Sequence, residues 1–424
     1  MSEGARPTVP AARFELLASD GAARRGQVTT ARGTFQTPVF MPVGTRGAVI
    51  HLDAGDYESL GLEIVLANTY HLMLRPGVDT VAALGGLEGF TGWGGHFLTD
   101  SGGFQVMSLG RRPGSGAAPS GGLAKSRVDD EGVTFRSVYD GSKVRLTPED
   151  AVDAQRRLAS DIQMALDVCP ELPAPPEDVR LAMERTHAWA ARAKAAMEAA
   201  RSDAVAMEAA RSDAVAMEAA RSDAVAMEAA RSDATLGGQA LFGIVQGGSD
   251  PQMRRHSAQT LAGIGFDGYG IGGLSVGETR TEMEPALRAA TDVLPTDRPR
   301  YLMGVGDPAR ITDAIAVGVD MFDCVLPSRL ARHGTALTPN GRINIRNARF
   351  ARDDTPLDLA PERPGGRFSR GYLRHLMSVN EPTAARILTL HNIAYVVGLV
   401  AEARAAITAG SFETFRRQVN EVWS

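Results

Sequence analysis

Two aspartates, Asp100 and Asp323, lie at the ends of short apolar runs. Burying a carboxylate there is costly unless it is paired, hydrogen-bonded or used in catalysis. Two carboxylates flanking a sugar can exchange its substituent with retention, one attacking the anomeric carbon while the other serves the departing base. We therefore predict Asp323 as nucleophile and Asp100 as acid/base group. A structural interpretation stays open, because an aspartate can also cap the turn that follows a strand.

Asp100 begins a turn of small residues that suits a planar base. Ser101, Gly102 and Gly103 leave the backbone open to close approach, and Phe104 offers a flat apolar face. We expect Asp100 to accept ring N–H groups and Phe104 to stack on the base. The same composition also makes ordinary tight turns, so the prediction depends on residues elsewhere.

Further groups are expected to recognise the edge of the base. Asp167 and Gln246 follow other apolar runs, and a carboxylate and an amide match the donors and acceptors of a purine. The run Gly270–Gly277 would add backbone groups at close range. Its glycine pattern is weak as a dinucleotide signature, because no acidic residue follows a strand at the expected interval.

The segment from Gly304 to Arg310 predicts a phosphate contact. Asp307 is a plausible N-cap with Pro308 at the first helical position, and the amides of a helix start bind phosphate readily. Six arginines without an acidic residue follow between Cys324 and Arg352, forming either a phosphate-facing surface or a solvated face. They are Arg329, Arg332, Arg342, Arg346, Arg349 and Arg352.

Eight short apolar runs must position these residues. They are Pro38–Val43, Ile64–Ala67, Phe97–Thr99, Ile162–Leu166, Leu241–Val245, Tyr269–Ile271, Tyr301–Met303 and Met321–Val325. Continuous apolar runs followed by helical patterns are typical of buried parallel strands, so we predict a (β/α)₈ TIM barrel. A doubly wound α/β sheet is the alternative. Residues at the strand ends would converge on one face: Asn68, Asp100, Asp167, Gln246, Gly273, Gly304 and Asp323.

Two stretches interrupt the pattern. Residues 110–125 are rich in glycine, proline and serine and predict a mobile loop. Residues 197–234 repeat the sequence MEAARSDAVA, whose residues favour helix. Ten residues fall about 80° short of three turns, so each copy faces a new direction. We expect a solvated helical protrusion or a partly disordered insertion, without chemistry, in a barrel domain over 1–352. A C-terminal helical subdomain would cover 353–424.

Composition narrows the function classes. Cys169 and Cys324 are too few for a disulfide framework or a cysteine metal cluster. The apolar runs are shorter than the roughly 20 residues of a membrane span and no signal peptide precedes them, so we expect a soluble cytoplasmic protein. A net charge of -5 argues against a surface that is positive throughout, but not against local patches.

Six segments together resemble the bacterial tRNA-guanine transglycosylase, or queuine tRNA-ribosyltransferase, family. The resemblance spans nearly the whole chain except the repeat. The segments are NTYHLMLRPG from Asn68, LTDSGGFQVMSL from Leu98, GIVQGG from Gly243, GFDGYGIGGLSVGE from Gly265, MGVGDP from Met303 and MFDCVLPSR from Met321.

The resemblance implies a TIM-barrel homodimer that binds tRNA and exchanges guanine at the anticodon wobble position. The incoming base would be a 7-deazaguanine, in bacteria 7-aminomethyl-7-deazaguanine, on the route to queuosine. Chemistry on a stacked nucleotide requires it to be flipped out. Asp323 would form a covalent ribosyl link, and Asp100 would be the acid/base group.

The resemblance also implies the residues that surround the substrate. Asn68 and His71 would support the ribose and the site, and Met303 would face Phe104 across the base. Further base contacts would be Asp100, Ser101, Gly102, Gly103, Asp167, Cys169, Gln246, Gly273 and Leu274. RNA contacts would be Gly304, Val305, Gly306, Asp307, Pro308, Ala309, Arg310, Ser328, Arg329, Leu330, Ala331 and Arg332.

Two departures from the family pattern change what is carried over. Bacterial members follow PLD with a CxCxxC run and a later histidine that bind zinc, whereas here LAPERPGGRFSR follows Pro356–Asp358. With three thiolates absent, tetrahedral zinc is implausible. We expect no metal or other cofactor, and we predict that His391 is a packed or surface residue. Loss of the zinc ligands is expected to affect the local fold and the dimer contact rather than the chemistry. Val168 replaces a glutamate that adapts the backbone near Leu274 to different bases, so the range of accepted bases stays open.

Two other functions stay open. A non-catalytic relative that only binds RNA or a partner would be free to lose the nucleophile, yet both carboxylates are present. A related exchanger could act on DNA or on another base.

Overall fold

The computed structural model describes residues 11–108, 126–219, 238–274, 279–358 and 363–424. Eight parallel strands close into a barrel in the order β10-β11-β12-β13-β14-β4-β5-β6, which confirms the predicted TIM barrel and excludes the open sheet. Each of the eight predicted apolar runs corresponds to one strand of the barrel. The strands are β4 Val39–Gly44, β5 Ile64–Ala67, β6 His96–Thr99, β10 Ile162–Met164, β11 Ala240–Val245, β12 Gly268–Ile271, β13 Arg300–Leu302 and β14 Met321–Cys324.

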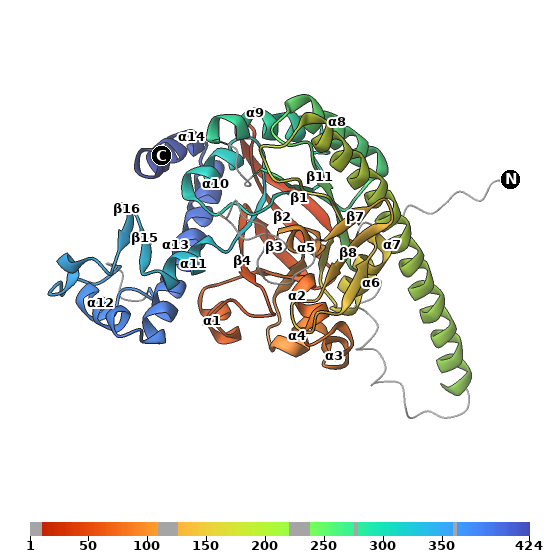
Figure 1. Ribbon diagram of the computed structural model, residues 1–424, viewed down its shortest axis with the longest axis horizontal. Coiled ribbons are helices and arrows are strands. Elements are labelled where there is room, and N and C mark those ends of the chain that lie inside the picture. The colour runs from red at the N-terminus through yellow and green to blue at the C-terminus, as the bar shows by residue number, and fades with distance from the viewer. Residues whose placement is uncertain (1–10, 109–125, 220–237, 275–278, 359–362) are drawn as a thin grey trace.

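Helices surround the barrel (Figure 1). Several begin at a polar cap followed by proline: Asp307 accepts hydrogen bonds from the amides of Ala309 and Arg310, as its predicted N-cap role requires. The helices between the strands are α1 Ala54–Ser59, α2 Thr69–Leu74, α3 Val78–Ala83, α4 Gly86–Thr91, α5 Gly103–Ser108, α6 Pro148–Arg157, α7 Pro176–Ala219, α8 Pro251–Ile264, α9 Arg280–Thr291, α10 Pro308–Ile315 and α11 Leu326–Arg332.

The barrel interior is a continuous apolar layer below the site. Its members include Leu66, Leu98, Ile244, Tyr301 and Met321, one from each of five strands. Side chains alternate along a strand, so the residue two positions later also faces inward, at the carboxyl end. Those residues are Asn68, Asp100, Gln246, Met303 and Asp323.

An antiparallel sheet closes the amino-terminal end of the barrel. Its strands are β1 Arg13–Asp20, β2 Ala23–Thr30 and β3 Gly33–Thr37, and Phe35 packs into the interior layer. Arg24 forms a buried ion pair with Asp320, which directly precedes β14. The sheet was not predicted from sequence. Because it fills the amino end, the substrate must enter from the carboxyl end.

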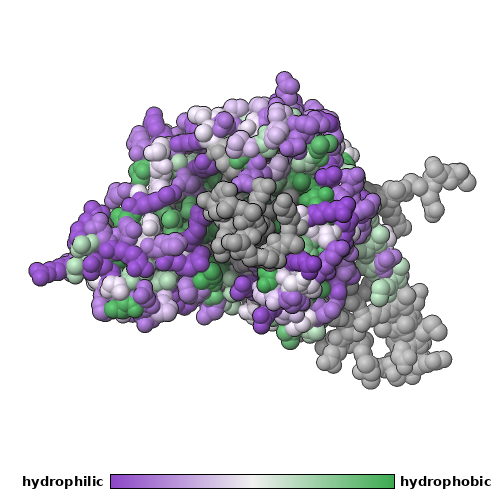
Figure 2. Space-filling view, viewed as in Figure 1, coloured by the Kyte–Doolittle hydropathy of each residue, from purple (hydrophilic) through white to green (hydrophobic). Residues whose placement is uncertain are grey.

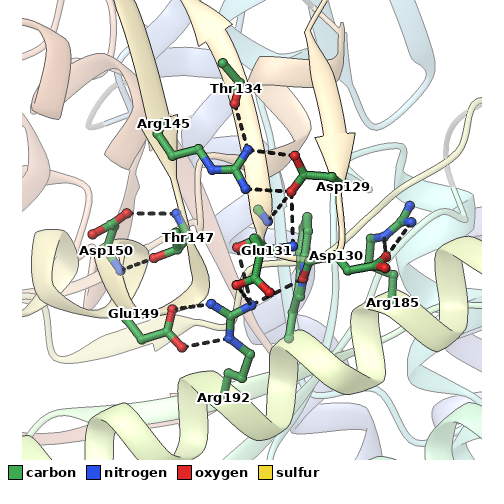
Figure 3. A network of polar contacts seen from close by, with 12 residues as sticks. Asp129, Asp130, Glu131, Thr134, Arg145, Thr147, Glu149, Asp150, Arg185 and Arg192 are labelled. Carbon is green, nitrogen blue, oxygen red and sulfur yellow. Dashed lines mark hydrogen bonds and ion pairs between the residues drawn. The ribbon is translucent and has the colours of Figure 1, made fainter.

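A second unpredicted sheet lies beside the site. Its strands are β7 Arg127–Asp129, β8 Gly132–Arg136 and β9 Lys143–Leu146. Val133 and Phe135 pack with Tyr70 of α2 and Val106 of α5. Figure 3 shows the ion pairs by which α7 holds two segments, the turn between β7 and β8 and the start of α6. These are Arg185–Asp130, Arg192–Glu131 and Arg192–Glu149, and Arg145–Asp129 lies within the sheet.

The chain ends in a small hairpin and three helices. These are β15 Thr335–Thr338, β16 Gly341–Asn344, the 3₁₀ turn η2 Ala348–Phe350, α12 Arg370–Ser378, α13 Pro382–Thr408 and α14 Phe412–Trp423. The hairpin and α12 extend to one side (Figure 1), whereas Val396 and Ile407 of α13 belong to the main core. The domain boundary at residue 352 stays a prediction.

Helix α13 alone among the described helices is long and apolar enough to cross a membrane. Of its most apolar stretch, 56% is buried inside the protein. A helix that forms part of a protein core has the same length and composition.

The first repeats continue α7 as one helix of 44 residues that extends beyond the barrel (Figure 1). Met197 is fully buried, and Arg201 bonds the Gln239 carbonyl and Asp267 at 2.7 Å each. Met207, at the same place in the next copy, is 71% exposed. Met197 and Arg201 of the first copy thus contact the rest of the protein, whereas Met207 of the second copy is exposed. The bounds of the insertion, 197–234, stay a prediction. Residues 220–234 of the repeat and the 110–125 loop lie outside the described residues.

The two methionines give a matched test of this packing. Met197→Ala is expected to lower the free energy of unfolding by about 2–5 kcal/mol, because a cavity replaces a buried side chain. Met207→Ala is expected to change it by less than about 0.5 kcal/mol, because its side chain is exposed. Urea unfolding measures both. Equal losses in the two variants would contradict the packing.

Candidate active site

Asp100 is buried at the end of β6 and held by three donors. The Thr69 amide donates to Oδ1 at 2.8 Å, Gln105 Nε2 donates to Oδ2 at 2.7 Å, and Asn68 Nδ2 also donates to Oδ2. The Thr69 hydroxyl donates to the Asp100 carbonyl at 2.5 Å. With one donor on Oδ1 and two on Oδ2, Asp100 can contact a base at Oδ1 or by exchanging a bond at Oδ2.

Asp323 is buried at the end of β14 and held at one oxygen. The Tyr301 hydroxyl and the Gly304 amide each donate to Oδ1 at 2.6 Å. Tyr301 comes from the neighbouring strand β13, and Gly304 begins the loop that follows it. Since both bonds end on Oδ1, Oδ2 is the oxygen that can face a substrate.

Burial dominates the protonation of both groups. It raises the pKa of Asp100 to about 6 against the hydrogen bonds of Asn68, Thr69 and Gln105, and the nearby Asp323 charge raises it further. Burial also raises the pKa of Asp323, and the bonds from Tyr301 and Gly304 oppose this effect. The two carboxylates thus share one poorly solvated space. A carboxyl group with a pKa near 6 can both donate and accept a proton near neutral pH.

A second pair of polar groups lies on neighbouring strands. Gln246 Nε2 donates to Asp167 Oδ2 at 2.7 Å, and the Ser101 hydroxyl reaches Oδ1 at 3.5 Å. Burial raises the pKa of Asp167 to about 6, against the bond from Gln246. Gln246 Oε1 is buried and accepts no hydrogen bond from any described residue. It is a natural acceptor for a ligand N–H group.

Glycine is required where β12 ends. Gly273 has φ +67°, and a Cβ there would stand 2.7 Å from Gln246 Oε1 and 3.6 Å from Cys169 Sγ. Leu274 next to it is fully buried. Asp167, Cys169, Gln246 and Gly273 therefore meet in one place, as sequence analysis expected.

The apolar faces predicted to stack on the base lie at the same end of the barrel. Phe104 on α5 is 47% exposed, and Met303 at the end of β13 is half-buried. Gly102 and Gly103 precede Phe104, packed against Tyr70 and Asp167. His71 on α2 is partly buried, which lowers its pKa, as does Arg46. Their contacts with substrate stay predictions.

The predicted RNA segments are exposed only in part. Val305, Gly306, Pro308, Ala309, Ser328 and Ala331 are buried. Gly304, Arg329 and Arg332 are exposed, and so are the other arginines of the stretch up to Arg352. Arg342 pairs with Asp307 at 2.8 Å. Figure 2 shows largely hydrophilic residues on the side of the molecule where Figure 1 labels β15, β16 and α12.

Three residues that hold the carboxylates were missed by sequence analysis. Thr69 and Gln105 directly follow residues that were chosen, and Tyr301 lies two positions before Met303 on β13. Alternation along β13 could have placed Tyr301 inside the barrel. Its bond to Asp323 needed the pairing of β13 with β14.

Among the described residues, no group of three or more histidine, cysteine or acidic side chains could hold a metal ion. His391 is 3% exposed and its Nε2 lies 2.7 Å from the Leu337 carbonyl. A Cβ on Gly365 would stand 2.6 Å from its Nδ1. His391 is therefore a packed residue with little space at either ring nitrogen.

Comparison with known proteins gives one consistent result. Residues 19–424 match the family described as queuine tRNA-ribosyltransferase. A protein of that name from Herpetosiphon aurantiacus is 45% identical over 95% of this chain and 90% of its own length. Proteins of the same name from Brucella suis and Xylella fastidiosa are 43% and 45% identical, and each alignment covers at least 95% of both chains.

The pKa of Asp167 predicts how an uncharged variant behaves with pH. In the folded state this pKa is about 6 rather than 3.8, so the folded protein keeps the proton longer than the unfolded chain. Below about pH 4 both states are protonated and burial of the group costs little; as pH rises through about 6, stability is lost. Asp167→Asn avoids this loss, and its amide can still accept from Gln246.

The variant is therefore expected to be more stable than wild type at pH 8, by at most roughly 3 kcal/mol, and about equal near pH 4. Thermal unfolding at both pH values measures the difference. A gain that is the same at both values would exclude titration of Asp167 as its cause.

Proposed function

The chain belongs to the queuine tRNA-ribosyltransferase family, and we propose that Asp323 and Asp100 carry out its base exchange by double displacement. The protein is accordingly a tRNA-guanine transglycosylase, a pentosyltransferase of tRNA processing in queuosine biosynthesis. Its substrates are tRNA and a guanine or 7-deazaguanine base. One observation carries the proposal: two buried carboxylates lie at one barrel mouth, and among the described residues one of them has hydrogen-bond donors only at Oδ1.

The first displacement forms a covalent link. Asp323 Oδ2 attacks C1′ of the target nucleotide, the bond from C1′ to the base nitrogen breaks, and its electron pair leaves with the base. Protonated Asp100 supplies the proton that the departing base takes up. Burial makes the Asp323 carboxylate poorly solvated and so a stronger nucleophile, while Tyr301 and Gly304 support its ionised form.

The second displacement reverses these steps with another base. Asp100, now ionised, removes a proton from the incoming base, whose nitrogen attacks C1′ and releases Asp323. The base would lie between Phe104 and Met303. Gln246 Oε1 and Asp167 would accept its N–H groups. We propose 7-aminomethyl-7-deazaguanine as the incoming base and the wobble guanine as the target.

The RNA would lie across the exposed residues that follow β13 and β14. Arg329 and Arg332 project from α11, directly after the nucleophile strand, and are solvent-exposed. Arginines neutralise backbone phosphates and position the strand without recognising sequence. The flipped nucleotide would then reach Asp323 from this side.

Zinc, which bacterial members of the family hold, does not fit the residues present. We propose that this protein binds none and needs no other cofactor. Support comes from the donor set: the chain's two cysteines follow β10 and end β14. His391 is tied to the Leu337 carbonyl. An apolar cluster of Ala336, Ile345, Leu357, Leu373 and Leu388 packs the hairpin and α12 against α13.

We further propose a homodimer in the cytoplasm. Its tRNA substrate is found there, and the resemblance to bacterial members implies the dimer. The apolar cluster around α12 would preserve the shape of the dimer contact without a metal.

Replacing the nucleophile tests the mechanism. Asp323→Asn is expected to reduce incorporation of labelled guanine into tRNA by at least about 10⁴-fold, because no covalent link can form. Wild type is also expected to yield a tRNA–protein adduct that survives denaturation, and the variant none. Circular dichroism serves as the folding control. Wild-type rates in a folded variant would eliminate the proposed nucleophile.

Metal removal tests the cofactor proposal. Purified protein is expected to contain far less than one zinc per chain, and a chelator should leave the melting temperature unchanged, because no tetrahedral donor set is present. Elemental analysis and thermal unfolding measure this. One zinc per chain, with a lower melting temperature after chelation, would refute it.

A further inference from the structure

A fully buried arginine, Arg254 of α8, lies beneath two turns of the site. Its Nε donates to the Gly248 carbonyl at 2.6 Å and its Nη1 to the Val245 carbonyl at 3.0 Å. The same Val245 carbonyl accepts the Gly272 amide at 3.1 Å. Its Nη2 lies 3.4 Å from the place of a Cβ on Gly273. One guanidinium thus connects the turn after β11 with the turn after β12.

Ser257, one helical turn further along α8, holds Gln246, which lies between Val245 and Gly248. It is fully buried, and its hydroxyl accepts the Gln246 amide at 3.2 Å. Its oxygen also lies 2.9 Å from His187 Nε2 of α7. Burial lowers the pKa of His187 to about 4, as does the neighbouring His256, so the ring is neutral, and in the tautomer with the proton on Nδ1 its Nε2 accepts the Ser257 proton. Val245, Gln246 and Gly248 are therefore each held at the backbone from below.

We infer that Arg254 and Ser257, with His187 behind them, are positioning residues that fix the Gln246 side chain against Asp167 and so set affinity for the base. The inference rests on the proposed base contacts of Gln246 and Asp167. Arg254 acts through the backbone and does not touch the substrate.

The cost of burial supports this role. A buried guanidinium is expensive unless its N–H groups are satisfied, and here the Gly248 and Val245 carbonyls accept from Nε and Nη1. Gly247 and Gly248 both have positive φ, which glycine adopts readily. Because glycine has no side chain, this turn has few contacts of its own to hold it. Arg254 replaces those missing contacts. Without it the Gln246 amide would occupy several positions, and the bound base would have to order it.

The experiment compares Arg254→Met with Arg255→Met in the full-length protein. Arg255 is the next residue on α8, is exposed, and pairs only at the surface with Asp292. Guanine exchange into tRNA is measured over ranges of guanine, of 7-aminomethyl-7-deazaguanine and of tRNA. Loss of charged hydrogen bonds should raise the KM for both bases about tenfold in Arg254→Met. The kcat and the KM for tRNA should stay within about twofold, and Arg255→Met should match wild type.

The KM of Arg254→Lys for both bases is expected to lie between the values of wild type and Arg254→Met. One ammonium group keeps the charge but cannot reach both carbonyls as the planar guanidinium does. If Arg254→Met does not fold, Ser257→Ala decides, with Thr260→Ala as its control. Thr260 bonds only the His256 carbonyl within its own helix. Ser257→Ala should raise the base KM by about threefold.

Two results would overturn the inference. One is a folded Arg254→Met variant whose base KM equals that of Arg255→Met. The other, where Arg254→Met does not fold, is a Ser257→Ala variant that equals Thr260→Ala. An inactive wild-type protein would instead contradict the proposed function, so the two failures are distinguishable.

Discussion

The site depends on keeping carboxylates in a space that water hardly reaches. Asp100, Asp167 and Asp323 are each less than 10% exposed, and burial raises the pKa of all three. The barrel contributes to this because apolar residues such as Leu98, Ile244 and Met321 fill its interior below the site. The same desolvation that costs stability brings the pKa of Asp100 near neutral pH, as the proposed acid/base role requires.

Hydrogen bonds decide how each carboxylate is used. Asp323 has two donors on one oxygen, which fixes its direction and leaves the other oxygen for the proposed attack on the ribose. Asp100 has donors on both oxygens, two from the side chains of Asn68 and Gln105 and one from the Thr69 amide. Asp167 is paired with an amide whose own oxygen has no donor among the described residues. The three groups thus differ in role because their neighbours differ.

Sequence patterns predicted the barrel and the residues on its rim but not what holds them. Continuous apolar runs identify buried parallel strands, and a polar residue at the end of each run marks the rim, as for Asp100 and Gln246. Strands β1–β3 and β7–β9 contain many polar residues among the apolar ones, so they were not predicted. Tyr301 looked like a core residue, since a tyrosine within an apolar run shows no partner. The sequence of α8 does not distinguish Arg254 from its neighbour Arg255, and only the structure shows that Arg254 is buried.

Asn392 connects α13 to the helix and the hairpin that follow the strand of Asp323. Asn392 of α13 is fully buried; its Nδ2 donates to the Pro327 and Thr335 carbonyls and its Oδ1 accepts the Leu337 amide. Pro327 is the second residue of α11 and lies three positions after the end of β14, the strand that carries Asp323. His391 adds a bond to the Leu337 carbonyl. The hairpin, α11 and α13 are thus joined by hydrogen bonds around an apolar cluster, so the position of α11 behind Asp323 depends on these bonds and on side-chain packing.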